Sequence, residues 1–387
     1  MRLHDVKIFV LDIYDQLRIN KKKKGEIKKY EHPKRKEIYS KIILTQEQKS
    51  AIDELYQKNY GEKIPYTWHQ HFTAFTGKFD VNYFPELLFI PEFEHFMNLY
   101  HEYSVALSDK NLLPLVVNGI GVRMPKTYIS ITKGVFRDAD NRFISKKEAV
   151  ELLKGCGKIF GKPSVDSNSG KGCMLLEFLN GKDKLSGKTV EEILDEIGED
   201  FVFQERIICH KSIQQIYPCS VNTFRIVTYR WKDKILHFPT IMRIGQKGSV
   251  VDNAHAGGVF IGIKEDGQMT ESAFTEFKDE YKVHPDTGVV FAEQKITLYP
   301  KLLQAAEVLH EALPQIGIVN WDFTIDEEGT PVLIEANIDS GTIWMTEMAH
   351  GCGAFGSHTE EVLKWIRFMK SKKASERFSY AYGKMEG

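Results

Sequence analysis

The sequence predicts an α+β protein of two or three domains, with a mostly helical N-terminal region followed by mixed helices and strands. Three observations support this prediction. The chain has 387 residues, which is enough to bury a large core. Strand-like and helical patterns follow one another without the strict alternation of a doubly wound sheet. From about residue 108 onward, glycines and alternating apolar runs become frequent, so we expect the helical region to end at residue 107.

The composition is that of a globular protein, since apolar residues make up 42% of the chain and charged residues 27%. The formal net charge of −1 argues against a dedicated nucleic-acid binder, because phosphate contacts need a clustered positive field. No apolar run has the length of a membrane span, and the first residues lack the pattern of a signal peptide. The five cysteines form no CxxC pair, which fits free thiols. We therefore expect a cytoplasmic protein.

The N-terminal region contains two predicted helices and a dense basic run. Thr45 and Gln48 form a capping box for a helix that ends near Gly61. Pro91–Tyr103 carries aromatic residues at helical spacing. The basic run, Lys21–Lys36, is explained either as a solvated face or as a contact with an anionic membrane or a polyanionic carrier. The sequence leaves both explanations open.

The second part of the chain combines strand patterns of alternating apolar residues with helical patterns. The expected helices are Asn111–Val117, Lys146–Lys154 and Leu298–Leu313. The expected strands are Pro125–Ile131, Ile159–Val165, Phe201–Ile208, Thr223–Trp231 and His237–Ile244. A turn-rich hairpin follows the last helix.

That hairpin, within Ile318–Gly341, is predicted to bring oxygen-bearing side chains to one face. With Glu327–Thr330 as the loop, Asp322 lies opposite Glu335. Asn337 then shares the face of Glu335, because side chains alternate along a strand. Two carboxylates and an amide oxygen suit a hard cation such as Mg²⁺. An ordinary acid-decorated hairpin is the alternative explanation.

A glycine-rich loop follows the strand that carries Lys162. Its residues Ser169, Gly170, Lys171 and Gly172 are small enough, or suitably charged, to let backbone N–H groups approach phosphate oxygens. The strand lysine would add a point charge for the same phosphates. The loop is not a Walker A motif, because glycine rather than Ser or Thr follows its lysine. Taken alone, the loop is better explained as a plain flexible turn.

Further polar groups gather at strand ends and in loops. The strand that begins at Phe201 ends in Gln204, Glu205, Arg206 and Ile207, whose backbone groups could pair with an adenine ring. Arg225 and Arg243 lie on successive strands, and each must be salt-bridged or aimed at an anion, because a buried arginine without one is costly. The candidate substrate residues are Asn222, Asp252, Asn253, His255, Gly257, Gly258, Ser340 and Gly341.

The order of these motifs resembles the ATP-grasp superfamily. That superfamily runs from a lysine before the first strand, through a strand lysine with a glycine-rich flap and an adenine hinge, to an acidic hairpin ending in Glu-x-Asn. The matching positions here are Asp109-Lys110, Lys162-Pro163 with the flap, Gln204–Ile207, and Asp322 with Glu335-Ala336-Asn337. The hairpin is similar to that of D-alanyl-D-alanine ligases. The resemblance covers roughly Pro85–Phe368.

Three stretches resemble one branch more closely, the sugar-transfer-associated ATP-grasp proteins, which are related to alpha-L-glutamate ligases. They are Ser220–Arg225, Val251–Asn253 with Gly257-Gly258, and Trp321-Asp322. The resemblance implies an ATP-grasp fold, in which two α+β subdomains clasp ATP. We therefore expect central and flap subdomains over 108–200, a C-terminal subdomain with the metal site over 201–372, and a tail over 373–387.

The resemblance also implies roles for the candidate residues. Lys110, Lys162, the flap and the hinge would bind ATP, and Asp322, Glu335 and Asn337 would bind Mg²⁺ or Mn²⁺. Many ligases of the superfamily carry an arginine two residues before the first metal-binding acid, where this chain has Asn320. We therefore expect Arg225 or Arg243 to stabilise the transferring phosphoryl group.

The implied activity is that of an ATP- and Mg²⁺-dependent ligase that joins a carboxylate to an amine or a thiol through an acyl-phosphate. Its setting would be polysaccharide biosynthesis or the modification of a sugar or a peptide-like metabolite. The expected partners are a small-molecule carboxylate and an amine or sugar-linked acceptor. One alternative is a kinase that phosphorylates a hydroxyl of a sugar or small molecule. A non-catalytic nucleotide-binding module is the weaker alternative, because every metal ligand is retained.

Overall fold

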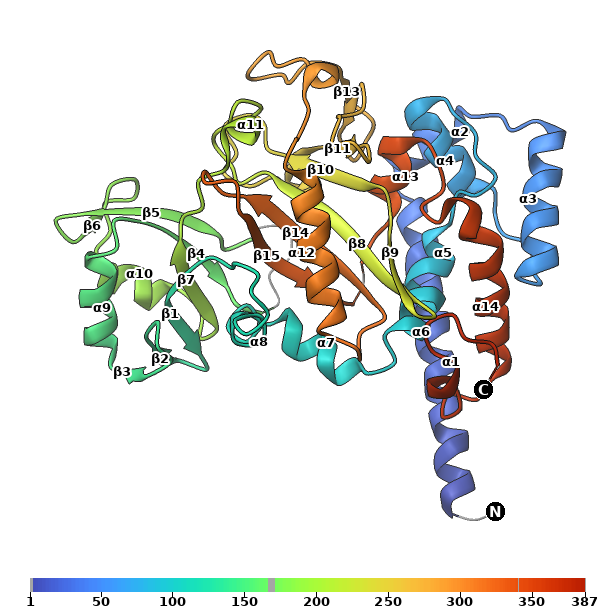
Figure 1. Ribbon diagram of the computed structural model, residues 1–387, viewed down its shortest axis with the longest axis horizontal. Coiled ribbons are helices and arrows are strands. Elements are labelled where there is room, and N and C mark those ends of the chain that lie inside the picture. Colours follow the sequence, from blue (N-terminus) through green and yellow to red (C-terminus); the bar gives the residue numbers. More distant parts are fainter. Residues whose placement is uncertain (1–2, 166–170, 340, 387) are drawn as a thin grey trace.

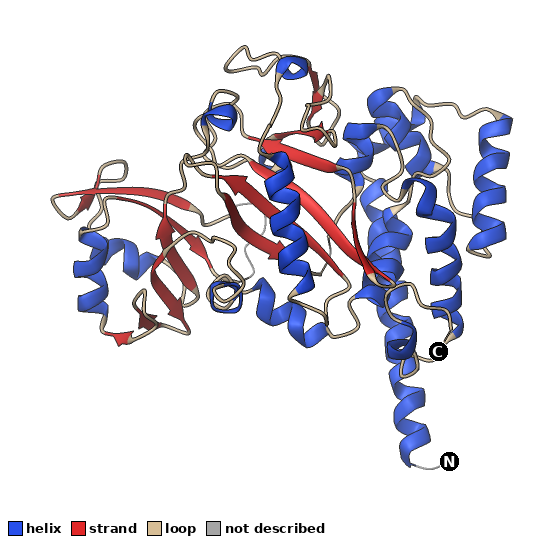
Figure 2. Cartoon of the chain, viewed as in Figure 1, coloured by secondary structure: helices blue, strands red, loops and turns tan. Residues whose placement is uncertain are grey.

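Two antiparallel sheets and a layer of helices make up the protein (Figure 1). The computed structural model describes residues 3–165, 171–339 and 341–386. Within these residues, a seven-stranded sheet lies at one end and an eight-stranded sheet in the middle. Helices from both ends of the chain gather at the other end (Figure 2). The predicted α+β class with a mostly helical N-terminal region is confirmed.

The seven-stranded sheet has the strand order β3-β2-β1-β7-β4-β5-β6. Helices α9 (Lys146–Lys154) and α10 (Val190–Glu196) share an apolar core with it, and each begins with a capping box. The helix predicted over Lys146–Lys154 is confirmed. The strands are β1 Thr127–Thr132, β2 Val135–Arg137, β3 Phe143–Ile144, β4 Lys158–Pro163, β5 Met174–Leu179, β6 Lys182–Asp183 and β7 Phe201–Glu205.

Strand β7 lies in the middle of this sheet, where it pairs with β1 and β4. The subdomain boundary predicted at residue 201 would separate β7 from these neighbours. Because β7 is hydrogen-bonded on both sides within the first sheet, we now propose that the boundary lies after Glu205. Pairing between strands distant in sequence leaves no local pattern from which this could be read.

The eight-stranded sheet has the order β13-β12-β11-β10-β8-β14-β15, with β9 paired to β8. Helix α12 (Tyr299–Glu311) packs on it and shares its apolar core. The strand predicted over His237–Ile244 is in fact two strands, because the chain turns between β9 and β10. The strands are β8 Thr223–Trp231, β9 Lys234–His237, β10 Thr240–Ile244, β11 Val259–Ile263, β12 Ala273–Phe274, β13 Glu280–Tyr281, β14 Ile318–Ile325 and β15 Pro331–Asn337.

The helical layer is built from both ends of the chain. Its N-terminal members are α1 Leu3–Tyr30, α2 Pro33–Ser40, α3 Gln46–Asn59 and α4 Thr67–Thr76, and its C-terminal members are α13 Trp344–His350 and α14 Thr359–Ser371. One apolar core joins these helices to the adjoining part of the eight-stranded sheet. The predicted capping box of Thr45 and Gln48 is present at the start of α3.

The prediction of one continuous helix over Pro91–Tyr103 is wrong. The chain forms α5 (Glu86–Leu88), a π-helical turn (Phe89–Glu94) and α6 (His95–Met97), and then resumes as α7 (His101–Ser108). Asn98 leaves the helix because its side chain binds the hairpin strands. Its Oδ1 accepts from the backbone N–H groups of Gly317 and Ile318 at 2.9 and 3.0 Å, and its Nδ2 donates to the carbonyl of Ile338 at 2.8 Å.

Short helical segments complete the described part of the chain. They are α8 Leu113–Val117, α11 Lys211–Gln214, and 3₁₀ turns at Ala254–Ala256, Phe291–Glu293, Gly356–His358 and Arg377–Tyr380. Among the described residues, no helix combines the length and the apolar character needed to cross a membrane.

Candidate active site

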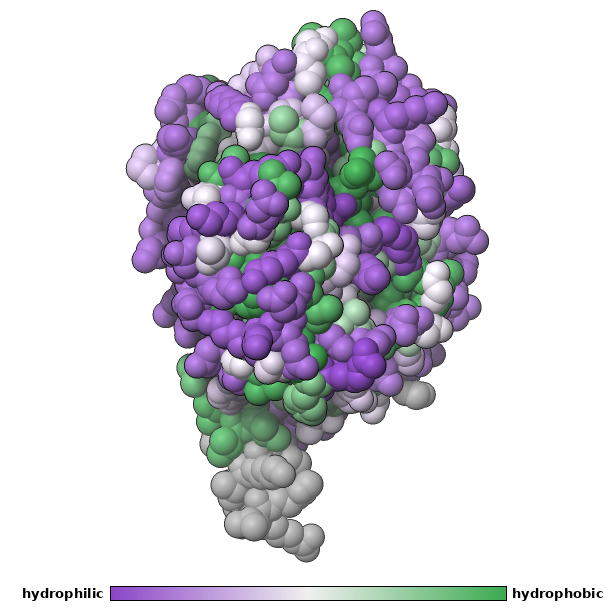
Figure 3. Space-filling view, turned by 90° about the vertical axis from the view of Figure 1, so that its left-hand side faces the viewer, coloured by the Kyte–Doolittle hydropathy of each residue, from purple (hydrophilic) through white to green (hydrophobic). Residues whose placement is uncertain are grey.

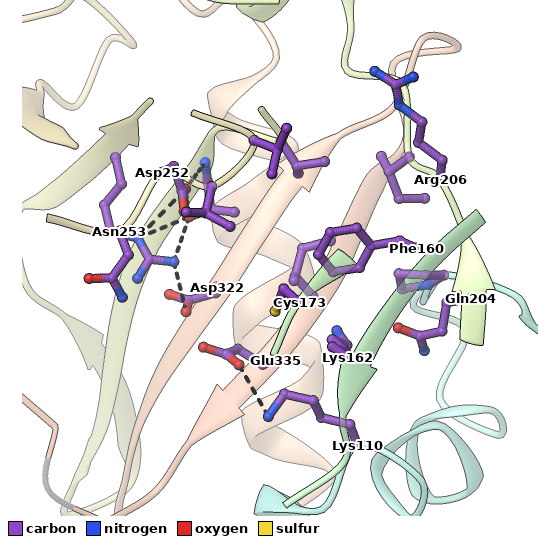
Figure 4. Close-up of a pocket in the computed structure, with 18 of the residues that line it drawn as sticks. Lys110, Phe160, Lys162, Cys173, Gln204, Arg206, Asp252, Asn253, Asp322 and Glu335 are labelled. Carbon is purple, nitrogen blue, oxygen red and sulfur yellow. Dashed lines mark hydrogen bonds and ion pairs between the residues drawn. The ribbon is translucent and has the colours of Figure 1, made fainter. Parts of the chain in front are cut away.

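A cleft opens between the two sheets (Figure 4). Strands β4 and β7 contribute one wall, and β8, β10, β14 and β15 contribute the other. Of the residues singled out from the sequence, eleven line this cleft: Lys110, Lys162, Gln204, Glu205, Arg206, Ile207, Arg243, Asp252, Asn253, Asp322 and Glu335. The fold therefore brings the predicted phosphate, hinge and metal residues to one place.

The hairpin of β14 and β15 pairs Asp322 with Glu335, as expected, but reaches this register by a different route. Ile325 pairs with Pro331, so the loop is residues 326–330 rather than 327–330. A bulge next to Asp322 inserts one extra residue in β15 and restores the pairing. The Asn337 amide nitrogen lies 3.3 Å from Asp322 Oδ2 and 3.4 Å from Glu335 Oε1. The three side chains therefore share one face.

Asp322 is fully buried and is held by both candidate arginines. Arg225 donates from Nε to Asp322 Oδ1 at 2.5 Å and from Nη2 to Oδ2 at 3.1 Å. Arg243 Nη2 lies 2.9 Å from Asp322 Oδ2. Burial alone would raise the pKa of Asp322, but the two guanidinium groups hold this pKa well below its usual value. The carboxylate is therefore ionised.

The two arginines differ in their other contacts and in whether they line the cleft. Arg225 lies directly across from Asp322 on the neighbouring strand β8. Arg243 lines the cleft and donates to Thr223 Oγ1 from Nε at 3.0 Å and from Nη2 at 2.7 Å. Thr223 in turn donates from its backbone N–H to Asp252 at 2.9 Å. Arg243 is thus the arginine that a bound molecule in the cleft can contact.

The oxygen set of Asp322, Glu335 and Asn337 fits a cation such as Mg²⁺. Within the described part of the chain, no cluster of three Asp, Glu, His or Cys side chains could hold an ion, so a site at this hairpin would need the Asn337 amide beside the two carboxylates. This amide now points its nitrogen at both carboxylates over long distances. Turning it over would direct Oδ1 to the same point and complete an all-oxygen set, which is the type that Mg²⁺ prefers.

Two lysines face these acids from the other side of the cleft. Lys110 Nζ lies 3.7 Å from Glu335 Oε2, and its backbone N–H donates to the carbonyl of Ser164 at the end of β4. Lys162 is buried on β4, and burial together with the nearby charge of Lys110 lowers its pKa to about 8. A bound anion such as phosphate would stabilise the charged forms of both lysines, because it offsets burial and the repulsion between them.

The predicted flap is only partly described. Ser169 and Gly170 lie outside the described residues. Lys171 is exposed and does not line the cleft, and Gly172 has a φ of 79° and lies against Pro163. The expected phosphate contacts of these four residues therefore remain predictions.

The predicted hinge lies where β7 ends, next to apolar side chains. Phe160, Ile207, Val221 and Ile334 line this part of the cleft and would suit a flat aromatic base. The side chain of Glu205 is engaged elsewhere, because its Oε1 accepts from Arg123 Nη2 at 2.9 Å and from the Lys126 backbone N–H at 2.7 Å. The Glu205 side chain is thus not free to pair with a base.

The predicted substrate residues separate into three groups. Asp252 and Asn253 line the cleft. His255 points away from it to Glu276, with Nδ1 2.7 Å from Oε2, while Gly257 and Gly258 shape the same loop. Asn222 is fully buried beneath the site, where it donates to the carbonyl of Tyr217 at 2.7 Å. Asn222 therefore holds the chain between Tyr217 and β8 in place and does not reach the space where a substrate would bind.

The end of the hairpin packs against the π-helical turn. Ser340 lies outside the described residues. The Gly341 backbone N–H donates to Glu94 Oε1 at 2.7 Å, and a Cβ at Gly341 would lie 2.0 Å from the amide nitrogen of Asn320. Asn320 is fully buried, so the space that an arginine would need at this position is already filled.

Sequence reasoning missed several residues that line the cleft. Thr223 links Arg243 to Asp252, and it could have been found because it lies two residues before Arg225 on the same strand. Phe160, Val221 and Ile334 resemble ordinary core residues in sequence. Cys173 also lines the cleft, and burial raises the pKa of its thiol, so this cysteine is protonated at neutral pH.

The two clasping subdomains, the cleft between their sheets and the acidic hairpin define the protein as one with the ATP-grasp fold. More specifically, residues 89–362, more than half of the chain, match the model of the sugar-transfer associated ATP-grasp family, and the chain belongs to that family. No curated protein matches the sequence.

Solved structures with related folds are distant. The chain is similar to D-alanine–D-alanine ligase from Bacillus anthracis at 12% identity and a TM-score of 0.38, over 71% of this chain and 69% of that one. It is similar to an N5-carboxyaminoimidazole synthase from Aspergillus clavatus at 8% identity and a TM-score of 0.36, over 62% of this chain and 47% of that one. The chain thus spans about half the length of the latter enzyme.

Proposed function

We propose that this protein is an ATP- and Mg²⁺-dependent ligase that joins a carboxylate to an amine or a thiol through an acyl-phosphate. The observation that carries the proposal is the meeting of two lysines, Lys110 and Lys162, with two carboxylates, Asp322 and Glu335, in one cleft. The Asn337 amide lies beside both carboxylates. The family description supports an acceptor linked to sugar metabolism. Positioning and charge neutralisation carry most of such a reaction.

In this proposal ATP lies between the two walls of the cleft. Phe160, Ile207 and Val221 pack against adenine, and backbone groups at the hinge pair with its edge. Lys110 and Lys162 bind the phosphates. Mg²⁺ held by the hairpin residues would neutralise charge on the β- and γ-phosphates.

Arg243 is the proposed stabiliser of the transferring phosphoryl group. It lines the cleft beside Asp322, and Thr223 fixes its guanidinium with two hydrogen bonds. A substrate carboxylate oxygen attacks the γ-phosphorus and ADP leaves. The amine then attacks the acyl carbon, loses a proton and displaces phosphate. No protein nucleophile is needed, which agrees with the raised pKa of the Cys173 thiol.

The test measures ADP and free phosphate from the full chain with ATP, Mg²⁺ and pairs of candidate acids and amines. A ligase releases phosphate only when both substrates are present, whereas a kinase forms ADP without free phosphate. Glu335→Gln should abolish turnover. Glu328→Gln, at the exposed tip of the same hairpin, is the matched control and should behave like the wild type. Full turnover by Glu335→Gln would contradict the metal assignment.

A further inference from the structure

Helix α1 has two opposite faces with different environments. One stripe faces the body of the protein: Asp12, Asp15, Ile19, Lys22, Glu26 and Tyr30. Asp12 accepts from the Ala374 backbone N–H at 2.7 Å, and Lys22 pairs with Asp339 at 2.7 Å. These positions recur at intervals of three and four residues, as expected for one face of a helix. This face holds α1 on the protein.

The opposite stripe faces solvent and changes character along its length: Val10, Tyr14, Leu17, Lys21, Lys24 and Lys28. At 100° per residue, its mean direction is about 180° from that of the body-facing stripe. The exposed fractions of Val10, Tyr14 and Leu17 are 56%, 69% and 62%. Along the helix, the stripe is therefore apolar in its N-terminal half and basic in its C-terminal half.

The basic part of this stripe is distinct from the rest of the lysine-rich run. Lys22, Lys23 and Lys29 form ion pairs with Asp339, Glu92 and Glu26. Lys21, Lys24 and Lys28 are exposed, and among the described residues none of them has an ion-pair partner. Within α1, the lysines without an ion-pair partner among the described residues thus lie on the outward face.

The apolar part lies where α1 extends past the body of the protein (Figure 1). Figure 3 shows a hydrophobic surface at the point where the helix leaves the body. The exposed apolar residues of α1 there are Val10, Leu11, Ile13, Tyr14 and Leu17. Five exposed apolar side chains within eight residues are unusual for a helix surrounded by water.

We propose that the outward face of α1 docks this protein onto an anionic lipid surface. The apolar side chains of Val10, Tyr14 and Leu17 would enter the boundary between headgroups and acyl chains. Lys21, Lys24 and Lys28, next along the same face, would lie against lipid phosphates and carboxylates. An amphipathic helix that combines an apolar stripe with neighbouring lysines binds membranes in this way.

A second copy of the chain fits this face less well. In a parallel helix pair, the lysines of one copy would face the same lysines of the other. In an antiparallel pair, the lysines would face the apolar half, Val10 to Leu17. Neither arrangement brings an acid to Lys21, Lys24 or Lys28, whereas an anionic lipid surface matches both halves of the stripe.

The test is sedimentation of the full chain with phosphatidylcholine vesicles that do or do not contain phosphatidylserine. We expect binding to the anionic vesicles only, and weaker binding at about 0.5 M salt. Replacing Lys21, Lys24 and Lys28 together by Gln should lower the affinity roughly a hundredfold, at roughly fivefold per lysine. Leu17→Glu should also lower it.

A charge-matched control replaces Lys147, Lys211 and Lys301, which are exposed on other elements, by Gln and should leave binding unchanged. Equal loss of binding in this control would overturn the proposal, because only net charge would then matter. So would equal binding to neutral vesicles. A chain that is dimeric by light scattering, becomes monomeric on Leu17→Glu and ignores vesicles would identify a second copy as the occupant instead. Circular dichroism and thermal unfolding show whether each variant is folded.

Discussion

Asp322 is a fully buried carboxylate that two arginines and one amide surround. Removing one partner from such a group is costly, because the remaining charge stays buried. The strand periodicity of the hairpin was enough to predict that Asp322, Glu335 and Asn337 share a face. That Arg225 and Arg243 both reach Asp322 depends on the order β10-β8-β14, which comes from pairings between distant segments and has no local signal.

Substitutions by lysine should distinguish the roles of Arg243 and Arg225. Arg243→Lys keeps the charge but loses the two hydrogen bonds to Thr223, so the cation at the γ-phosphate would be misplaced. We expect kcat to fall by roughly 10²- to 10³-fold with little change in the KM for ATP. Arg225→Lys should mainly lower the melting temperature, because Arg225 does not line the cleft. Steady-state phosphate release and thermal unfolding measure the two effects, and the reverse pattern would exchange their roles.

Lys162 gives a prediction in which stability and binding move in opposite directions. Its pKa of about 8 in the folded protein lies below the ordinary lysine pKa of 10.5, because burial disfavours the charged form. This cost is complete below pH 8 and disappears as the pH rises to 10.5. Lys162→Met should therefore raise the free energy of unfolding at pH 7, by about 1–3 kcal/mol, and weaken ATP binding.

Urea unfolding without nucleotide and calorimetric titration with ATP measure these two effects. In the wild type, ATP affinity should fall as the pH rises above about 8, and Lys162→Met should lack that step. Unchanged ATP affinity in the variant would remove Lys162 from the phosphate site.

Among the elements, the hairpin and the capped helices were the most predictable, because their signals are local. Thr45 and Gln48 form the capping box that their spacing predicts, and the helix expected over Lys146–Lys154 has the same bounds in the structure. The continuous helix over Pro91–Tyr103 failed because Asn98 binds strands more than two hundred residues away. Such a contact overrides the local helical pattern.

A chain of contacts links helix α2 to the loop at the cleft. Arg35 donates to Glu276 Oε1 at 2.9 Å, His255 lies 2.7 Å from Glu276 Oε2, and the His255 backbone N–H donates to Asn253 Oδ1 at 2.9 Å. Asn253 lines the cleft. Glu276→Gln should loosen this loop and raise the KM for the second substrate roughly fivefold, without changing the ATP affinity.

The matched control is Glu37→Gln on the same helix as Arg35, which breaks an exposed ion pair with Lys41 at the end of that helix. It should leave both substrates unaffected. Equal changes for ATP and the second substrate in Glu276→Gln would contradict a role confined to the substrate loop.

For the whole molecule, the apolar core under the helical layer joins segments from both ends of the chain. The Phe355 ring lies 4.8 Å from the rings of Phe84, Phe93 and Phe238, centroid to centroid. Phe355→Ala should lower the free energy of unfolding by about 3–5 kcal/mol, because it leaves a cavity between helices and sheet. Urea unfolding measures this change, with exposed Phe143→Ala as the control. The aromatic residues of Pro91–Tyr103 were visible in the sequence, but not the distant segments that Phe93 meets.

The bulge in the hairpin makes the strand register at the tip independent of the register at the cleft. The ladder beyond Phe323 is offset by one residue from the ladder that contains Asp322 and Glu335. A slip of the exposed tip can therefore be absorbed at the bulge rather than turning the carboxylates away from the cleft. A lengthened loop at the tip would then be tolerated, whereas an insertion on the cleft side of the bulge would not.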